Sequence, residues 1–294
     1  MARPGCLQSW PNWAAKIWSA RRRASILVSS GPYRLELAPM TDVPAFPITM
    51  QRSQSTAALL TMVLVWQIAS SIAADRLFPG PVQVVSVLLH EAVRGELPYH
   101  LGISLARVVA SLGSAIVIGA ALGYAAGRSH RADIWMRPWI VLLLNMPALI
   151  TVILIYIWLG LAETALVLAV ALNKIPNVVV TIREGASRLD KDFAEMAELY
   201  RFGRAAKLQH VVLPQLAPFF LVTLRSGLAL TWKIVLLAEL LGRSNGVGFQ
   251  LQVYFQNFDV THILAYAISF GVVMLAIEYG LLVPLERRLF AWRR

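Results

Sequence analysis

The sequence predicts an all-α membrane protein that crosses the bilayer six times. Its apolar residues gather in runs of about 18 to 25, which is the length that a helix needs to cross the hydrocarbon core. Only 15% of the 294 residues are charged and the mean hydropathy is +0.62, whereas soluble domains carry about 25% charged residues. A soluble globular domain is therefore not the expected fold.

Residues 1–52 are polar, basic and rich in proline, with Arg21, Arg22 and Arg23 near their centre. They hold no apolar core followed by a small-residue cleavage site, so they do not look like a cleaved secretory signal. Their composition predicts a disordered cytoplasmic tail. The membrane domain is expected over residues 53–294.

The first span is predicted over residues 56–74, and the segment 78–81 then breaks the chain with two prolines and a glycine. Apolar residues recur at helical spacing over 82–94, which predicts a short amphipathic helix at the outer surface. The second span, 101–127, is rich in glycine, alanine and serine. These small residues should let neighbouring helices approach closely.

The third span is predicted over residues 134–160, and Pro138 and Pro147 should bend it. The remaining spans are predicted over 164–182, 216–241 and 263–284.

Six spans place both termini on one side, and the positive-inside rule selects that side. With the termini inside, the inner segments hold 20 of the 27 Lys and Arg residues and the outer segments hold three. Both termini are therefore expected to be cytoplasmic. This asymmetry also accounts for the net charge of +11 as topology and attraction to anionic lipid, so nucleic acid is not an expected partner.

A polar segment, 192–214, separates the fourth and fifth spans and carries both signs of charge at helical spacing. Glu198 and Arg201 are three residues apart, so they should pair on one helix face. Gly203 is expected to mark a turn between two short helices, and Pro214 to begin the fifth span. The segment is predicted to be a helical hairpin on the inner side.

Within this segment, Glu195-Met196-Ala197 precedes Val211-Val212-Leu213-Pro214. The segment resembles the EAA loop of bacterial ABC-importer permeases, whose pattern is E-A-A, three residues, G, nine residues, I-x-L-P. The spacing from Glu195 to Pro214 matches that pattern. Two positions depart from it: Met196 stands at the second position, and Arg201 stands at the glycine position, two residues before Gly203.

The resemblance covers roughly residues 56–292 and is most specific for the nitrate, sulfonate and taurine branch of these permeases. The matching pieces are Ser104-Leu105-Ala106-Arg107-Val108, Leu224-Arg225-Ser226-Gly227-Leu228, Thr231-Trp232, Ala238-Glu239, Gly246-Val247-Gly248, the region of Asp259, and Leu285-Glu286-Arg287-Arg288-Leu289.

The resemblance implies a multi-pass permease subunit in a bacterial inner membrane. Two copies, expected to be identical, would form the translocation path, and a solute-binding protein would deliver substrate outside. Two ABC ATPase subunits would bind on the cytoplasmic side, and each would receive the coupling loop, 184–213, of one copy. The residues expected to couple to the ATPase are Glu195, Met196, Ala197, Glu198, Arg201, Gly203, Arg204, Leu213 and Pro214.

The chain itself is expected to be neither an enzyme nor a cofactor protein. No G-x-x-x-x-G-K-[ST] motif occurs in the sequence, so ATP hydrolysis must come from a partner. The single cysteine excludes an internal disulfide. The five histidines are scattered and predict no metal site.

Charges within the spans are costly and need partners or water. Arg225 and Glu278 both lie roughly 12–16 Å from the inner ends of their spans, so they should pair. Either this pair is purely structural or Arg225 lines the path. Lys233 and Asn145 are further candidates for the path, and a path-facing Lys233 would favour an anion such as nitrate, a sulfonate or taurine.

Two other basic residues fall within the predicted spans. Lys174 should snorkel toward the inner surface, whereas Arg107 has no clear role.

Three alternatives remain. A self-contained secondary transporter or channel would keep the spans and need no ATPase, although no clear internal repeat supports it. An intramembrane enzyme would need a convergent catalytic set, and Glu278 is the one acid expected among the polar groups of the spans. A structural anchor for a cytosolic complex would leave Lys233 without a use.

Overall fold

The computed structural model describes residues 48–289, and every element in that range is helical. The chain divides into two compact units, Met1–Ala58 and Leu59–Arg294. The first unit contributes only the start of helix α2 (Ile48–Ala73) to the described residues. Most of the predicted tail, residues 1–47, lies outside the described range, while residues 48–52 belong to α2.

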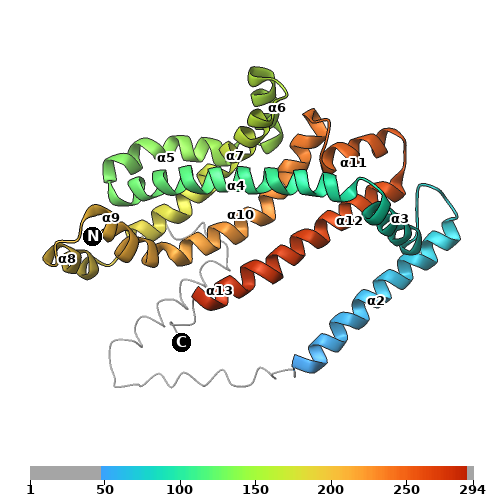
Figure 1. Ribbon diagram of the computed structural model, residues 1–294, viewed down its shortest axis with the longest axis horizontal. Coiled ribbons are helices and arrows are strands. Elements are labelled where there is room, and N and C mark those ends of the chain that lie inside the picture. The colour runs from blue at the N-terminus through green and yellow to red at the C-terminus, as the bar shows by residue number, and fades with distance from the viewer. Residues whose placement is uncertain (1–47, 290–294) are drawn as a thin grey trace, which may run out of the picture. The chain divides into compact units, whose positions relative to one another are not determined.

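The second unit is built around three long helices, α4 (Leu97–Arg128), α7 (Glu163–Ser187) and α10 (Leu213–Gly242), which pack against one another (Figure 1). Small residues permit this packing, as expected from the composition of the second span. A Cβ atom added to Gly119 would lie 2.6 Å from Cβ of Val178, and one added to Gly127 would lie 2.6 Å from Cβ of Ala186. Both distances are too short for two carbon atoms that are not bonded. The close packing of α4 on α7 therefore requires glycine at positions 119 and 127 of α4.

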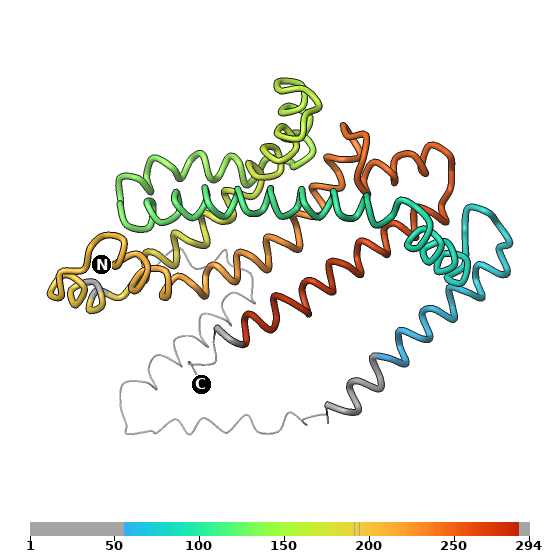
Figure 2. The backbone as a smooth tube through the Cα atoms, in the orientation of Figure 1, coloured from blue at the N-terminus to red at the C-terminus, as the bar shows by residue number. Residues whose placement is uncertain are grey.

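Shorter helices surround this core. Helix α3 (Pro81–Arg94) is the predicted amphipathic helix, and it packs on α12 (Val260–Ile277). Helix α11 (Val247–Gln256) joins α10 to α12 and contacts both. Figure 2 shows the backbone turning back at α11 and then following α12 away from it.

The predicted third span is not one helix. It consists of α5 (His130–Asn145) and α6 (Ala148–Leu159), whose axes differ by 100°. The break falls at Pro147, which lacks an N–H group, and the preceding residue, Met146, has the extended backbone that proline favours before it. Pro138 lies inside α5, so only the second of the two predicted bends breaks the helix.

Five helical segments of the described chain are long and apolar enough to cross a membrane, or six if the bent pair α5–α6 counts as one span. The all-helical membrane fold is therefore confirmed. The five segments are Thr56–Ala73, Leu97–Arg128, Glu163–Ser187, Arg204–Gly242 and Val260–Arg287.

Two π-helical turns precede prolines at corresponding places. The first, η1 (Leu208–Val212), leads into α10, and the second, η2 (Glu278–Leu282), leads into α13 (Val283–Leu289). In each case the residue before proline donates its N–H to a carbonyl five residues earlier: Leu213 to Leu208 and Val283 to Glu278. The proline has no N–H for an ordinary helical bond, and the wider turn accommodates this loss.

Candidate functional site

The polar segment before α10 folds as the predicted helical hairpin. Helix α8 (Lys191–Leu199) is followed by a tight turn and by α9 (Arg204–Lys207), which continues through η1 into α10. The turn is a Schellman motif, because Phe202 N–H donates to the carbonyl of Ala197 at 2.8 Å and Arg201 N–H donates to that of Glu198 at 3.0 Å.

The turn residue is Arg201, not Gly203. Arg201 has φ +53°, the left-handed conformation that usually selects glycine at this position of a Schellman motif. Gly203 has φ −62° and caps the start of α9. Gly203 does lie between the two short helices, as predicted, but it is not the left-handed residue of the turn. That residue is Arg201, which stands at the glycine position of the EAA pattern.

The predicted pair between Glu198 and Arg201 is also wrong. Arg201 has left the helix, so the two side chains no longer share a helix face. Glu198 instead accepts a bond from Nζ of Lys207 at 2.9 Å, which ties α8 to α9.

The hairpin exposes apolar side chains to an unusual degree. Leu199 is 80% exposed, Tyr200 69% and Phe193 50%, while Ala197 is buried. Glu195 lies on the same helix and is exposed. Large exposed apolar side chains on a polar segment are typical of a protein contact site.

A second group of charges lies between α10 and the last span. Arg225 of α10 pairs with Glu278 at 3.2 Å, as predicted, and also with Glu286 at 3.4 Å. Eight residues apart on an α-helix, the two glutamates would differ by about 80° in direction. The additional residue in the π turn η2 brings them closer to one face, where both reach the same guanidinium.

The Arg225 side chain is 51% exposed and lines a cavity of about 480 Å³ between the two spans. The pair is therefore accessible rather than a sealed core contact.

The other predicted path residues lie apart from this group. Lys233 is exposed, with its Nζ 5.5 Å from the centroid of the Trp232 ring. Asn145 is exposed at the end of α5, and its side chain donates to the carbonyl of Val141 at 2.8 Å. The described contacts connect neither residue to Arg225. Lys174, expected to snorkel, is instead 97% buried among the core helices.

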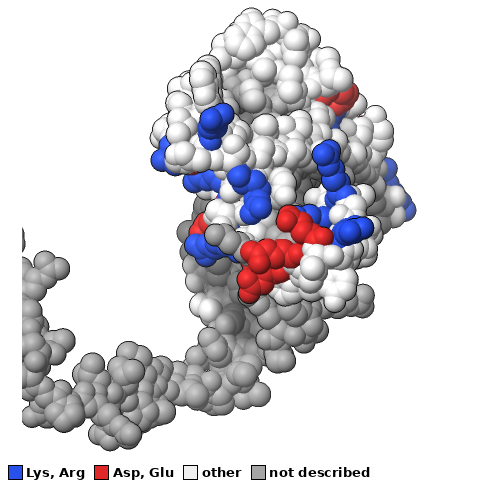
Figure 3. Space-filling view, turned by 90° about the vertical axis from the view of Figure 1, so that its left-hand side faces the viewer, with Lys and Arg blue, Asp and Glu red and all other residues white. Residues whose placement is uncertain are grey.

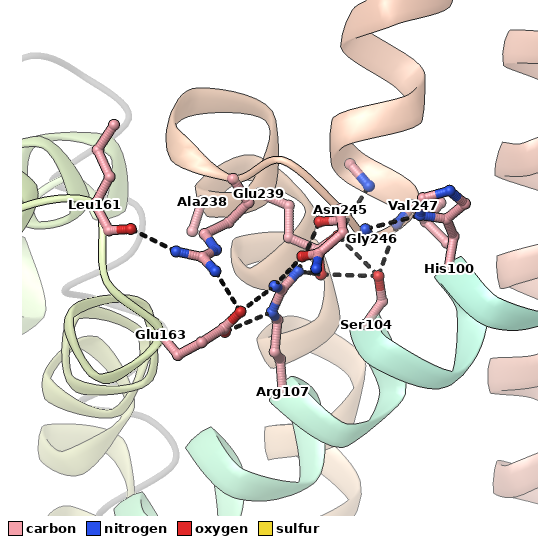
Figure 4. Close-up of polar contacts among 12 residues, drawn as sticks. His100, Ser104, Arg107, Leu161, Glu163, Ala238, Glu239, Asn245, Gly246 and Val247 are labelled. Carbon is pink, nitrogen blue, oxygen red and sulfur yellow. Dashed lines mark hydrogen bonds and ion pairs between the residues drawn. The ribbon is translucent and has the colours of Figure 1, made fainter.

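The largest buried polar cluster joins α4, α7 and α10 (Figure 4). Arg107 of α4 is 4% exposed, and its Nη1 donates to Oε1 of Glu239 on α10 at 2.8 Å. Its Nε and Nη2 donate to the carboxylate of Glu163, the first residue of α7, at 2.9 and 2.5 Å. One guanidinium thus joins three helices.

The carboxylate of Glu239 is fully buried and has further donors. Ser104 Oγ donates to it at 2.8 Å, as does the backbone N–H of Gly248. A buried carboxylate that accepts several hydrogen bonds and faces a guanidinium is stabilised in its charged form, which compensates its desolvation.

The loop between α10 and α11 closes over this cluster. Gly246 has φ +103°, and its N–H donates to Nδ1 of His100 at 3.0 Å. A Cβ atom at this position would lie 2.5 Å from the Glu239 carboxyl carbon and 2.6 Å from Nη1 of Arg107. Glycine is required here for both conformation and space.

Sequence reasoning missed this cluster. It counted Glu278 as the one acid of the spans, but Glu239 is an acid within α10 and is the most deeply buried charge of the described chain. Two signals were available: Ser104 and Arg107 lie three residues apart on one face of α4, and Glu239 is the one acidic residue of α10. Each is a weak signal until the fold brings α4 and α10 together.

Among the described residues, no group of three or more His, Cys, Asp or Glu side chains is placed to hold a metal ion.

Fold and sites together define a class: an integral membrane protein with several spans, a charged cluster within its helix bundle and an exposed helical hairpin between two spans. The chain belongs to the family of binding-protein-dependent transport system inner membrane components, whose profile matches residues 115–283. It is a multi-pass inner-membrane protein of the ABC-importer permease type, in the nitrate, sulfonate and taurine branch.

Three relatives illustrate the branch. The taurine transport system permease protein TauC of Escherichia coli is 28% identical over 254 residues, covering 84% of this chain and 92% of TauC. The putative aliphatic sulfonates transport permease protein SsuC of Escherichia coli is 30% identical over 217 residues, covering 70% of this chain and 79% of SsuC. The nitrate import permease protein NrtB of a Synechocystis strain is 26% identical and covers 79% of this chain and 89% of NrtB.

Proposed function

We propose that this chain forms the solute path of an ABC importer and couples it to ATP hydrolysis by a separate ATPase subunit. The observation that carries the proposal is the α8–α9 hairpin, a rigid polar element with exposed apolar side chains between two spans. A groove on the ATPase would receive it, and closure of two ATPase subunits would move two hairpins together. The membrane helices would follow as rigid bodies between two states.

The proposed coupling segment comprises exposed residues of the hairpin, its buried Ala197 and its attachment to α10. Its members are Glu195, Met196, Ala197, Glu198, Arg201, Gly203, Arg204, Leu213 and Pro214. The Schellman turn and the bond from Lys207 to Glu198 support a preformed hairpin, and preorganised elements bind at lower entropic cost.

The proposed topology has six spans, with α5–α6 as one bent span and both termini in the cytoplasm. The excess of Lys and Arg in the segments then facing inward supports this orientation. It also places the hairpin on the side where ATP is available.

The proposed substrate is a small anion such as nitrate, a sulfonate or taurine. The substrates in the names of the three relatives support this class. Arg225, Lys233, Glu278 and Asn145 are the proposed path residues, and the exposure of Arg225 and Lys233 supports contact with water or with a second subunit. A second copy of this chain and an extracytoplasmic solute-binding protein complete the proposed assembly.

The test is co-purification of the tagged chain with its ATPase in mild detergent. Glu195→Ala should lose the ATPase, whereas Glu96→Ala, which removes an exposed carboxylate before α4 and outside the coupling loop, should retain it. Equal retention by both variants would contradict the assigned contact surface.

The competing function is a self-contained secondary transporter or channel. A wild-type chain that purifies alone and still transports nitrate or taurine into liposomes without ATP would establish that function and refute the ABC-importer proposal.

A further inference from the structure

Two adjoining cavities lie where α4 ends and α5 begins. One has a volume of about 430 Å³ and is lined by the ends of α4 and α7 and the start of α5. The other, about 680 Å³, is a groove along one face of α5. His130 and Arg137 line both, so the cavities meet at these two side chains.

The first cavity is polar and basic. Each of the three helices contributes one arginine to it: Arg128 from α4, Arg137 from α5 and Arg183 from α7. Figure 3 faces this end of the molecule and shows Lys and Arg side chains gathered on it, beside an acidic patch. The lining also includes the carboxylates of Asp133 and Glu184, but Glu184 is already bonded to Arg188 outside the cavity.

Asp133 holds two of the guanidiniums in position. Its Oδ2 accepts from Nη2 of Arg137 at 2.6 Å and its Oδ1 from Nη1 of Arg183 at 2.7 Å. Each guanidinium has five N–H donors, and the described contacts use one on each, so the remaining donors are available to a ligand. Arg128 has no described ion pair. The cavity is thus a preformed site for an anion with several acceptor oxygens.

The second cavity is apolar and continues from the first. Beyond His130 and Arg137 its lining is Ile134, Pro138, Val141 and Leu142, which form one stripe of α5. Trp135 and Trp139 are 78% and 65% exposed on the same helix, and exposed tryptophans mark the level of the lipid headgroups.

We propose that these two cavities form one binding site for an anionic phospholipid, with the phosphodiester among the arginines and an acyl chain along α5. A cavity of this volume accommodates a glycerophosphate headgroup, and basic pockets between membrane helices on the cytoplasmic side suit such headgroups. The site is distinct from the coupling hairpin and from the Arg225 group. The proposed orientation of the chain in the membrane determines only which leaflet supplies the lipid, and this would be the cytoplasmic leaflet.

The experiment is native mass spectrometry of the full-length chain in an equimolar mixture of phosphatidylglycerol and phosphatidylcholine with matched acyl chains. The wild type should retain phosphatidylglycerol preferentially. A basic residue near a membrane surface contributes about a factor of five in affinity for anionic lipid. The double variant Arg128→Gln/Arg137→Gln should therefore lower the preference by roughly 25-fold.

A matched variant controls for net charge. Arg131→Gln/Arg287→Gln removes the same charge from exposed residues, and neither residue lines the two cavities. It should keep the preference. Equal losses in the two double variants, or no preference in the wild type, would overturn the proposal.

A competition experiment separates a lipid site from a site for soluble phosphate. The deacylated headgroup glycerophosphoglycerol and sodium phosphate, each against sodium chloride of equal ionic strength, should fail to displace the bound lipid. Displacement by either at the concentration of the lipid would mean that the apolar groove contributes nothing, and would overturn the assignment to a phospholipid.

Discussion

Replacing Glu239 by glutamine tests the buried cluster most directly. The glutamine keeps the size of the side chain but removes its charge and replaces one acceptor oxygen with an NH₂ group. That group would face donors on Ser104, Arg107 or Gly248, all about 2.8 Å from the present carboxylate. Removing one partner of a buried ion pair costs about 3–5 kcal/mol.

The expected result is a large loss of thermal stability. A loss of 1 kcal/mol lowers Tm by about 2–4 °C in chains of roughly this size, so Glu239→Gln should lower it by about 6–20 °C. The assay is thermal unfolding of the detergent-purified chain, followed by tryptophan fluorescence. Glu163→Gln is the matched control, because Glu163 contacts the same guanidinium but is 51% exposed, and exposed pairs contribute up to about 1 kcal/mol.

A further variant separates charge from packing. Arg107→Met/Glu239→Met removes both charges. It should recover part of the stability lost in Glu239→Gln, in which the buried Arg107 is left with only the half-exposed Glu163 as a charged partner. If Glu239→Gln costs no more than Glu163→Gln, burial does not determine the strength of the cluster, and the reasoning fails.

Three further predictions concern the turn, the loop and the accessible pair. Gly246→Ala should lower the free energy of unfolding by about 2–4 kcal/mol through a strained φ and a steric clash. The control Gly113→Ala, with open space around it, should be neutral or slightly stabilising in the same unfolding assay. Equal effects of the two variants would contradict the geometry. Arg201→Gly should relieve about 1 kcal/mol of backbone strain. The amide hydrogen of Phe202 should then exchange more slowly, and faster exchange would refute this prediction. Arg225→Gln should lower Tm by less than about 4 °C because its pair is half exposed. A much larger drop in Tm would show that the pair is structural.

Five of the six predicted spans match long apolar helical segments of the described chain, because such a span needs only a long apolar run, whereas the third is broken before Pro147. The hairpin was predictable from charge spacing and from the resemblance of Glu195–Pro214 to the EAA loop, and the pair Arg225–Glu278 followed from equal depth in two spans. Each of these signals lies within a short stretch of sequence or depends only on the depth of a residue in the membrane.

What escaped prediction depends on three-dimensional contact. Glu239 becomes a site only because Ser104, Arg107 and Gly248 meet it from other parts of the chain. The position of the hairpin turn escaped for another reason: residue preference assigned it to Gly203, but the Schellman bonds of α8 determine that Arg201 takes the left-handed conformation. Tertiary and capping bonds outweigh a preference of about 1 kcal/mol.

The π turn η1 has a consequence for how the chain tolerates changes in length. Helices α9 and α10 form one continuous rod through it, so the direction in which the hairpin projects around the axis of that rod is set by the number of residues between them. The π turn holds one residue more than an α-helical turn, so deleting one residue from 208–212 would convert it to an ordinary turn and keep the direction of the hairpin. Inserting one residue would instead rotate the hairpin by about 100° relative to the membrane helices. The direction of the hairpin around this axis therefore depends on the number of residues in the turn, and a single-residue insertion here should be far more damaging than a single-residue deletion or a substitution.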